Sequence, residues 1–248
     1  MPAVFVHGNP ETAAVWEPLL AELGRDDVVC LSPPGFGAPL PEGFGATVGD
    51  YRDWLIAELS RFTEPVDLVG HDWGGHHVLG AVMSRPDLVR SWVSDTAGGL
   101  EPDYEWHELA RRWQTPGVGE ADVAERFGAP FAERVELLVG RGMSEAVAKR
   151  LAEGMNEEMG RAVLALYRSA AQPVMAELGR DLERAAQRPG LVVLATEDQV
   201  VGTEEQRRRA ARRAGAHVAT LEGLGHWWLA QDPARSAAAI AEFWAGLG

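Results

Sequence analysis

Hydrophobic residues along this chain fall into short runs that alternate with longer segments of helical spacing. The apolar runs have the length and composition of buried strands and cover residues 2–6, 27–32, 66–69, 89–94, 190–195 and 216–221. Between them, apolar positions recur every three or four residues, which predicts helices over residues 11–23, 48–62, 75–83, 204–214 and 233–247. Strands that alternate with helices predict a doubly wound, mostly parallel α/β sheet.

The pattern changes between residues 100 and 183. No strand-like run occurs there, and Trp, Met, Arg and Glu punctuate helical stretches. We therefore expect a core formed by residues 1–99 and 184–248, with residues 100–183 inserted as a helical cap. A cap of this kind excludes water and shapes an apolar pocket.

Composition narrows the classes of function. The chain has 248 residues, 46% of them hydrophobic, which is enough for one α/β domain with an insertion. A net charge of −14 argues against binding to nucleic acid or to an anionic membrane surface. No apolar stretch approaches the ~18 residues of a transmembrane helix. No basic-then-apolar leader is present either, so we expect a cytoplasmic protein.

The stretch Gly70-His71-Asp72-Trp73-Gly74 lies between a predicted strand and a predicted helix. The spacing Gly-x-nucleophile-x-Gly at such a junction is the nucleophile elbow of α/β-hydrolases. Glycines on both sides permit a tight, strained turn that lifts the central side chain clear of the sheet. The alternative interpretation is a glycine-rich turn in which Asp72 caps the following helix.

A carboxylate at the centre of the elbow changes the chemistry that the turn would support. A serine that attacked a saturated carbon would form an ether, which water does not readily cleave. An aspartate forms an ester instead, and water activated by a histidine can hydrolyse that ester at its carbonyl carbon. Asp72 therefore predicts displacement at sp3 carbon, with a halide or an epoxide oxygen leaving, rather than ordinary esterase chemistry.

The base and the acid of a catalytic triad have candidates in the expected chain order. His226 follows the last predicted strand, where an α/β-hydrolase places its base. Asp198, in the loop after the preceding strand, is positioned to hold the tautomer of His226 and to stabilise its imidazolium. Glu197 beside it and Asp95, at the end of the strand after the elbow, are the alternatives for the acid.

The stretch His7-Gly8-Asn9-Pro10 follows the first strand, at the edge of the sheet where such folds bind ligands. The backbone N–H groups of Asn9 and Trp73 are candidates for an oxyanion hole during ester hydrolysis. Their side chains, an amide and an indole, are neutral donors of the kind that suits a departing halide. Alternatively, Asn9 is only a turn residue before Pro10.

Two further clusters have simpler interpretations. His71, His76 and His77 surround the elbow without accompanying ligands at metal-binding spacing, so we expect helix packing or contacts to the groups that surround the catalytic residues, and no metal. The arginine-rich run 207–213 is typical of a solvated helix face.

Taken together, the motifs at residues 7–10, 70–75 and 225–226 resemble those of haloalkane dehalogenases, which are α/β-hydrolases with an Asp nucleophile. The resemblance implies that Asp72 is the nucleophile, His226 the base, and Asn9 with Trp73 the halide-binding pair. It also implies a small apolar substrate, water as the sole cosubstrate, and no metal or organic cofactor. Residues 106–111 and 166–168 look similar to the dehalogenase cap. Because the chain starts almost at the first of these motifs, we expect the first two strands of the usual sheet to be missing.

Two alternatives remain open. Residues 34–37 and 113–117 resemble epoxide hydrolases, which share the Asp elbow but use cap tyrosines to protonate the epoxide oxygen. Tyr104 and Tyr167 are the candidate donors here, and Trp106 and Trp113 are candidates for the pocket wall. Hydrolase folds also serve as non-catalytic ligand-binding proteins. The presence of all three triad candidates in order favours an enzyme.

Overall fold

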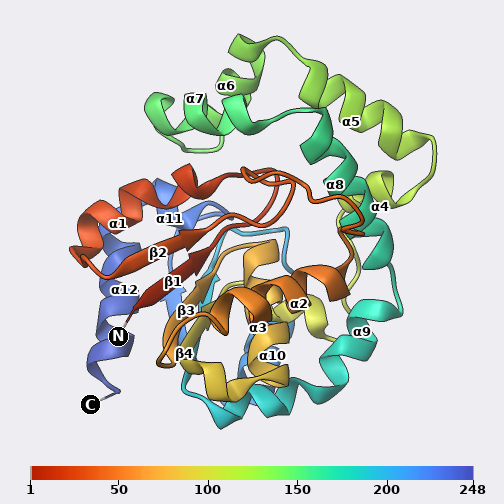
Figure 1. Cartoon of the computed structure of the whole chain (residues 1–248). Helices are drawn as coiled ribbons and strands as arrows, with labels where there is room; N and C mark the ends of the chain where they lie inside the picture. The colour runs from red at the N-terminus through yellow and green to blue at the C-terminus, as the bar shows by residue number, and fades with distance from the viewer. Residues whose placement is uncertain (1, 248) are drawn as a thin grey trace.

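The computed structural model describes residues 2–247, and its centre is one sheet of six parallel strands (Figure 1). The strand order is β2-β1-β3-β4-β5-β6. The strands are β1 (Ala3–Val6), β2 (Val28–Leu31), β3 (Val66–Gly70), β4 (Val89–Ser94), β5 (Gly190–Ala195) and β6 (His217–Leu221). The predicted doubly wound parallel sheet is therefore confirmed. Within the described residues, β2 and β6 are the edge strands of the sheet.

The order of the strands fixes where a ligand can bind. The first strand, β1, pairs with β2 on one side and with β3 on the other, so the connections on its two sides run in opposite directions. A crevice forms at such a switch point, outside the carboxyl ends of the strands. The loop after β1 carries Asn9 and the turn after β3 carries Asp72, so both candidates lie at this edge.

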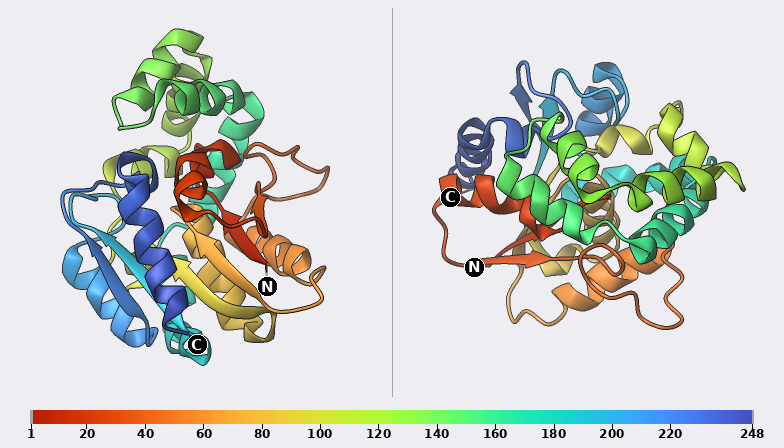
Figure 2. Two further views of the ribbon diagram at one scale, coloured as in Figure 1. Left: turned by 90° about the vertical axis from the view of Figure 1, so that its left-hand side faces the viewer. Right: turned by 90° about the horizontal axis from the view of Figure 1, so that it is seen from above.

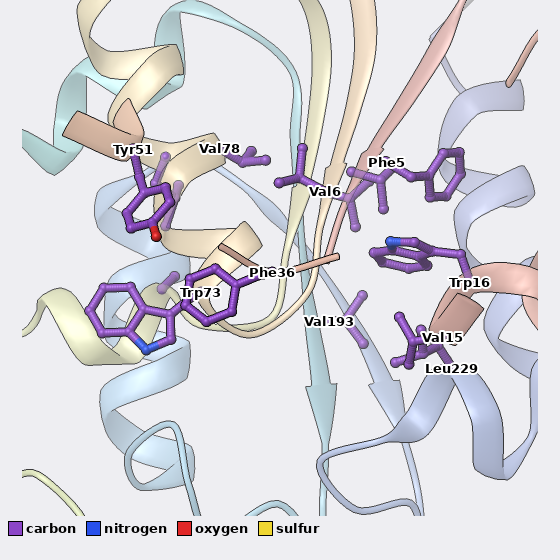
Figure 3. Close-up of a cluster of buried hydrophobic side chains, with 14 of the residues drawn as sticks. Phe5, Val6, Val15, Trp16, Phe36, Tyr51, Trp73, Val78, Val193 and Leu229 are labelled. Atoms are coloured by element: carbon purple, nitrogen blue, oxygen red, sulfur yellow. The ribbon is translucent and has the colours of Figure 1, made fainter. Parts of the chain in front are cut away.

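Helices cover both faces of the sheet. Helix α1 (Glu17–Leu23) packs against α12 (Pro233–Ala245) on one face, while the other carries α2 (Val48–Leu59), α3 (Trp73–Ser84) and α10 (Glu204–Arg213) (Figure 1). Figure 3 shows Phe5 and Trp16 on one side of the strands, and Tyr51 and Val78 on the other. Because β1 and β5 are buried on both faces, their sequences are continuous apolar runs instead of alternating ones. The equally buried β3 departs from this pattern at Asp67.

The first predicted helix is shorter than expected. Residues Ala13–Trp16 form a 3-10 helix that Thr12 caps, and the α-helix begins only at Glu17. Pro18 has no N–H to donate to the carbonyl four residues earlier, which explains why the α-helix does not extend further back. Glu11, predicted as the start of this helix, lies outside it and is fully buried. Its side chain is therefore available to the site.

The chain between β4 and β5 is helical, as the pattern predicted. Its elements are η3 (Ala97–Leu100), α4 (Glu108–Gln114), α5 (Val118–Gly128), α6 (Phe131–Val139), α7 (Glu145–Gly154), α8 (Glu157–Ser169), α9 (Val174–Leu178) and η4 (Gly179–Gln187). Helices α5, α6 and α7 stand off from the sheet at one end of the molecule (Figures 1 and 2). The last element, η4, packs beside α3 and α10 as the chain returns to the start of β5, and α9 packs against η3 and η4. Two short elements, η2 (Pro86–Leu88) and α11 (Trp228–Gln231), complete the structure.

Among residues 2–247, no helix combines the length and the apolar character that crossing a lipid bilayer would require.

The contact between β1 and α3 gives a test of this packing. A Cβ added at Gly74 would lie 2.0 Å from the Val6 carbonyl oxygen. Gly74→Ala should therefore lower the free energy of unfolding by roughly 1–3 kcal/mol, because backbone must move to admit the methyl group. At Gly49, in α2, the nearest atom would be 3.8 Å away, so Gly49→Ala is the matched control and should not destabilise. Equal urea midpoints for the two variants would contradict the packing.

Candidate active site

Asp72 occupies a strained turn between β3 and α3. Its backbone has φ 50° and ψ −126°, a conformation that L-residues rarely adopt. The N–H of Asp72 donates to Asp95 Oδ1 at 3.0 Å, and the Thr96 hydroxyl donates to the Asp72 carbonyl at 3.2 Å. The Asp72 side chain makes no capping hydrogen bond to α3. The turn therefore has the geometry of the elbow and not that of a helix cap.

The two oxygens of the Asp72 carboxylate have different partners. Oδ1 accepts a hydrogen bond of 2.9 Å from the backbone N–H of Asn9. Oδ2 lies 3.3 Å from His226 Nε2. This close approach requires a glycine at residue 8, where a Cβ would lie 2.2 Å from Asp72 Oδ1. Burial opposes the charged carboxylate, but hydrogen bonding and charge from His226 outweigh burial and hold the pKa of Asp72 below its usual range.

Of the three candidates for the acid, the structure brings Asp198 to His226. Asp198 Oδ2 lies 2.9 Å from His226 Nδ1, and Oδ1 accepts from the Val200 N–H at 2.7 Å. Burial disfavours the imidazolium, but the Asp198 and Asp72 carboxylates outweigh it and raise the pKa of His226 well above its usual value. Glu197 is exposed, and Asp95 contacts other groups. The His226 ring thus connects Asp72 on one side with Asp198 on the other.

A second group of buried ionisable side chains, His71 with Asp95 and Glu11, lies next to this one. The sequence analysis did not predict this ionic set. His71 is fully buried, with Nδ1 2.5 Å from Asp95 Oδ2 and Nε2 3.3 Å from Glu11 Oε1. Burial alone would lower the pKa of His71, but the two carboxylates outweigh burial and raise it to about 10. The ring of His71 lies 4.9 Å from that of His226, centroid to centroid. The ionic set around His71 therefore lies next to the candidate base.

The two carboxylates of the second set connect the loops of the site. Glu11 accepts hydrogen bonds from the Gly8 N–H at 3.2 Å and from the Trp227 indole at 2.7 Å. Asp95 accepts from the Trp228 indole at 2.8 Å. The loops after β1, β3, β4 and β6 are thereby fixed relative to one another. An acidic residue directly after the His-Gly-Asn-Pro stretch was the sequence signal for Glu11, but helical periodicity obscured it.

The aromatic candidates from the inserted segment gather over Trp73. Trp106 stacks on Trp73 with centroids 5.9 Å apart, and Tyr167 approaches it edge-on at 5.4 Å. Trp113 lies behind Tyr167, at 4.8 Å. The Tyr104 hydroxyl points elsewhere and donates to the Val200 carbonyl at 3.0 Å. Of the candidates, Trp106 and Tyr167 therefore contact the elbow directly.

Asn9 differs from the other polar groups of the site because its side chain has no partner. Both Nδ2 and Oδ1 of Asn9 are buried and make no hydrogen bond within the described residues. A buried amide that forms no hydrogen bond costs free energy comparable to the loss of one. Such a group, next to a nucleophile, is suited to a ligand.

The remaining histidines of the cluster behave as packing residues. Burial lowers the pKa of His76 to about 4 and that of His77 to about 3, so both are neutral. The His77 ring stacks on Tyr51 at 5.0 Å. Within residues 2–247, no group of three or more His, Cys, Asp or Glu side chains is arranged to hold a metal ion.

Comparison with known proteins bears on the fold and the family. The sequence profile described as "Alpha/beta hydrolase family" matches residues 3–239. Over 91 residues the chain is 32% identical to (E)-2-((N-methylformamido)methylene)succinate hydrolase of Acinetobacter baylyi, a stretch that covers 36% of this chain and 35% of that protein. Over 143 residues it is 32% identical to Epoxide hydrolase 2 of Siraitia grosvenorii, covering 49% and 44% respectively. The matches therefore span less than half the length of either relative.

Among solved structures, a loop variant of a haloalkane dehalogenase from Bradyrhizobium elkanii superposes with a TM-score of 0.69. The superposition covers 99% of this chain and 90% of that one, at 22% identity. At this identity the likeness establishes the fold alone.

The charge of His71 can be tested through the pH dependence of stability. Its folded-state pKa of about 10 lies above the ordinary 6.5, so its contribution is complete below pH 6.5 and is lost as pH rises through 10. Relative to His71→Gln, the wild type should lose on the order of a few kcal/mol of unfolding free energy across this window. Urea unfolding at several pH values measures the difference. A difference that stays constant with pH would show that His71 is neutral.

Proposed function

The chain belongs to the alpha/beta hydrolase family, and we propose that it hydrolyses a small apolar substrate at sp3 carbon through an alkyl ester on Asp72. The proposal is based on one observation: the two carboxylate oxygens of Asp72 have different partners. One oxygen accepts from the Asn9 N–H, and the other faces His226. An ionised carboxylate held in this way is a positioned nucleophile.

In the first step, Asp72 Oδ2 attacks the substrate carbon, and the bond to the leaving group breaks with its electron pair. Oδ1 keeps its hydrogen bond to Asn9 and becomes the carbonyl oxygen of the ester. Alkylation also removes the negative charge from Asp72. Because that charge helps to raise the pKa of His226, its loss makes the imidazolium easier to deprotonate and so prepares the base.

In the second step, His226 Nε2 takes a proton from water while the water oxygen adds to Cγ of Asp72. The negative charge develops on Oδ1, where the Asn9 N–H stabilises it. The bond between Cγ and the alkyl-bearing oxygen then breaks, and the alcohol takes the proton from His226. Asp198 orients the ring and stabilises its charge throughout. The new carboxyl group ionises, which releases the proton that accompanies the leaving anion.

For the leaving group we favour a halide, which makes the chain a haloalkane dehalogenase. The support is the Asn9 side chain, a buried neutral amide without a partner. A halide needs hydrogen bonds but no proton, and Asn9 with the Trp73 indole offers two neutral donors. Water completes the reaction, so the proposal includes no metal and no organic cofactor.

Epoxide hydrolysis to a diol is the second candidate, and Tyr167 is the observation that favours it. Tyr167 is buried against Trp73, where its hydroxyl could protonate an alkoxide. The other cap tyrosine, Tyr104, already donates to the Val200 carbonyl. That contact leaves Tyr167 as the remaining candidate donor and makes this candidate the weaker of the two. A non-catalytic ligand-binding role is weaker still, because Asp72, His226 and Asp198 are joined in one set.

Removal of the base should trap the ester. In His226→Phe, attack by Asp72 can proceed, but no group activates water, so an alkylated protein should accumulate. Intact-mass measurement after incubation with a substrate should show a gain equal to the alkyl group. The double variant His226→Phe with Asp72→Asn is the matched control and should show no gain. Absence of any adduct from a substrate that the wild type turns over would sink the covalent mechanism.

One substrate panel separates the two leaving groups. Bromide release from short bromoalkanes should fall roughly 10- to 100-fold in Asn9→Ala, because the variant loses the side-chain donor but keeps the backbone N–H. Tyr167→Phe should have a mild effect on the same reaction. Diol formation from styrene-oxide-like epoxides that Tyr167→Phe abolishes, with no bromide from any haloalkane, would establish the epoxide candidate instead. Turnover of neither class would favour the ligand-binding role.

A further inference from the structure

Helix α10 is not the solvated basic face that its sequence predicted. Arg208 is partly exposed and pairs with Glu204, as expected. Arg209 and Arg213 instead reach the buried carboxylate of Glu101. Arg207 is buried, with 3% of its surface exposed. Arginine is rarely buried to this extent unless it is paired, so the place of Arg207 requires an explanation.

Arg207 directs its guanidinium at the turn that carries Asp198. Nη1 donates to the Ala195 carbonyl at 2.8 Å, and Nη2 donates to the Asp198 carbonyl at 3.2 Å. The Ala195 carbonyl also accepts from the Asp198 N–H, which closes the turn. The planar fork of arginine thus bridges the first and last residues of this turn. Among residues 2–247, no carboxylate oxygen lies within ion-pair distance of Arg207.

The fold leaves room for this arginine. A Cβ on Gly98, in η3, would lie 2.8 Å from Arg207 Cγ and 2.7 Å from the Val201 carbonyl oxygen. Only glycine at this position lets the arginine side chain reach the end of β5. Tyr104 contacts the same loop through the hydrogen bond from its hydroxyl to the Val200 carbonyl. The loop that carries Asp198 is therefore fixed at two points.

We propose that Arg207 is a positioning residue for the second step of the reaction. Its guanidinium sets the turn from Ala195 to Asp198 and supplies positive charge beside the Asp198 carboxylate. Arg207 thereby acts through Asp198 on the orientation of His226. This inference rests on the proposed function for its kinetic consequence, but the contact between Asp198 and His226 can be tested without any substrate.

The proposal predicts an effect on one step only. Alkylation of Asp72 does not use His226 as a base, whereas hydrolysis of the ester does. Burial opposes ionisation of Asp198, while charge from His226 and, to a smaller extent, Arg207 keeps its pKa below the usual range. Loss of the guanidinium should therefore loosen the turn and weaken the hold of Asp198 on the ring, which slows hydrolysis and spares alkylation.

Single-turnover kinetics on the full chain test this expectation. Arg207→Met should leave the alkylation rate within about threefold of wild type and slow ester hydrolysis by about 100-fold, so the adduct accumulates. Arg207→Lys keeps the charge but can reach only one of the two carbonyls, and should show a smaller loss of hydrolysis. Arg208→Met, on the same helix, is the matched control and should behave as wild type. Equal slowing of both steps would indicate a merely structural role and overturn the proposal.

Proton NMR tests the contact between Asp198 and His226 without any substrate. The proton between His226 Nδ1 and Asp198 should give a downfield resonance, assigned by its loss in His226→Phe. It should persist in Arg208→Met and shift or disappear in Arg207→Met. If Arg207→Met does not fold, Arg207→Lys decides, and a wild-type resonance with wild-type hydrolysis in that variant would overturn the proposal. An altered resonance without turnover of any substrate would refute the proposed function while it supports the role of Arg207.

Discussion

Four buried carboxylates lie near the C-terminal ends of the strands, and the site depends on how their negative charge is balanced. Glu11 and Asp95 share the imidazole of His71, and Asp72 and Asp198 share that of His226. The two rings lie against each other. Burying a carboxylate without a partner costs free energy, and each imidazole supplies a partner to two of the four carboxylates. Loss of either imidazole leaves two buried acids without their counter-charge.

This balance gives the two imidazoles different roles. His71 keeps both partners throughout any reaction at the elbow, because neither Glu11 nor Asp95 is placed to attack a substrate. His226 has a partner that is also the candidate nucleophile. Alkylation of Asp72 would remove half of the charge that holds the proton on His226. The ionic contacts of His71 therefore stay constant, whereas those of His226 change during the reaction. Asp198, whose turn contacts Arg207 and Val200, is the partner that His226 keeps.

The local sequence was sufficient to predict the strands and helices and the chain order of the three catalytic candidates. Parallel strands that are buried on both faces are mostly apolar along their length, so their positions were visible as short apolar runs in the sequence. The elbow was visible because tight backbone contacts admit only glycine at Gly70 and Gly74, whose Cβ atoms would collide with neighbouring backbone. The choice among Asp198, Glu197 and Asp95 stayed open, because three carboxylates near the ends of two adjacent strands are equivalent until side-chain directions are known.

The sequence by itself determined the parallel sheet, the elbow at Asp72 and the candidate base at His226, because each depends on residue types within a few positions of one another. Only the tertiary structure decided what Glu11 and Arg207 do. A glutamate after a loop and an arginine in a basic run are both surface residues by periodicity. Each is buried because its partners come from distant segments: His71 and Trp227 for Glu11, and the end of β5 for Arg207. Partners that are brought together by folding, and not by spacing along the chain, leave no local pattern to read.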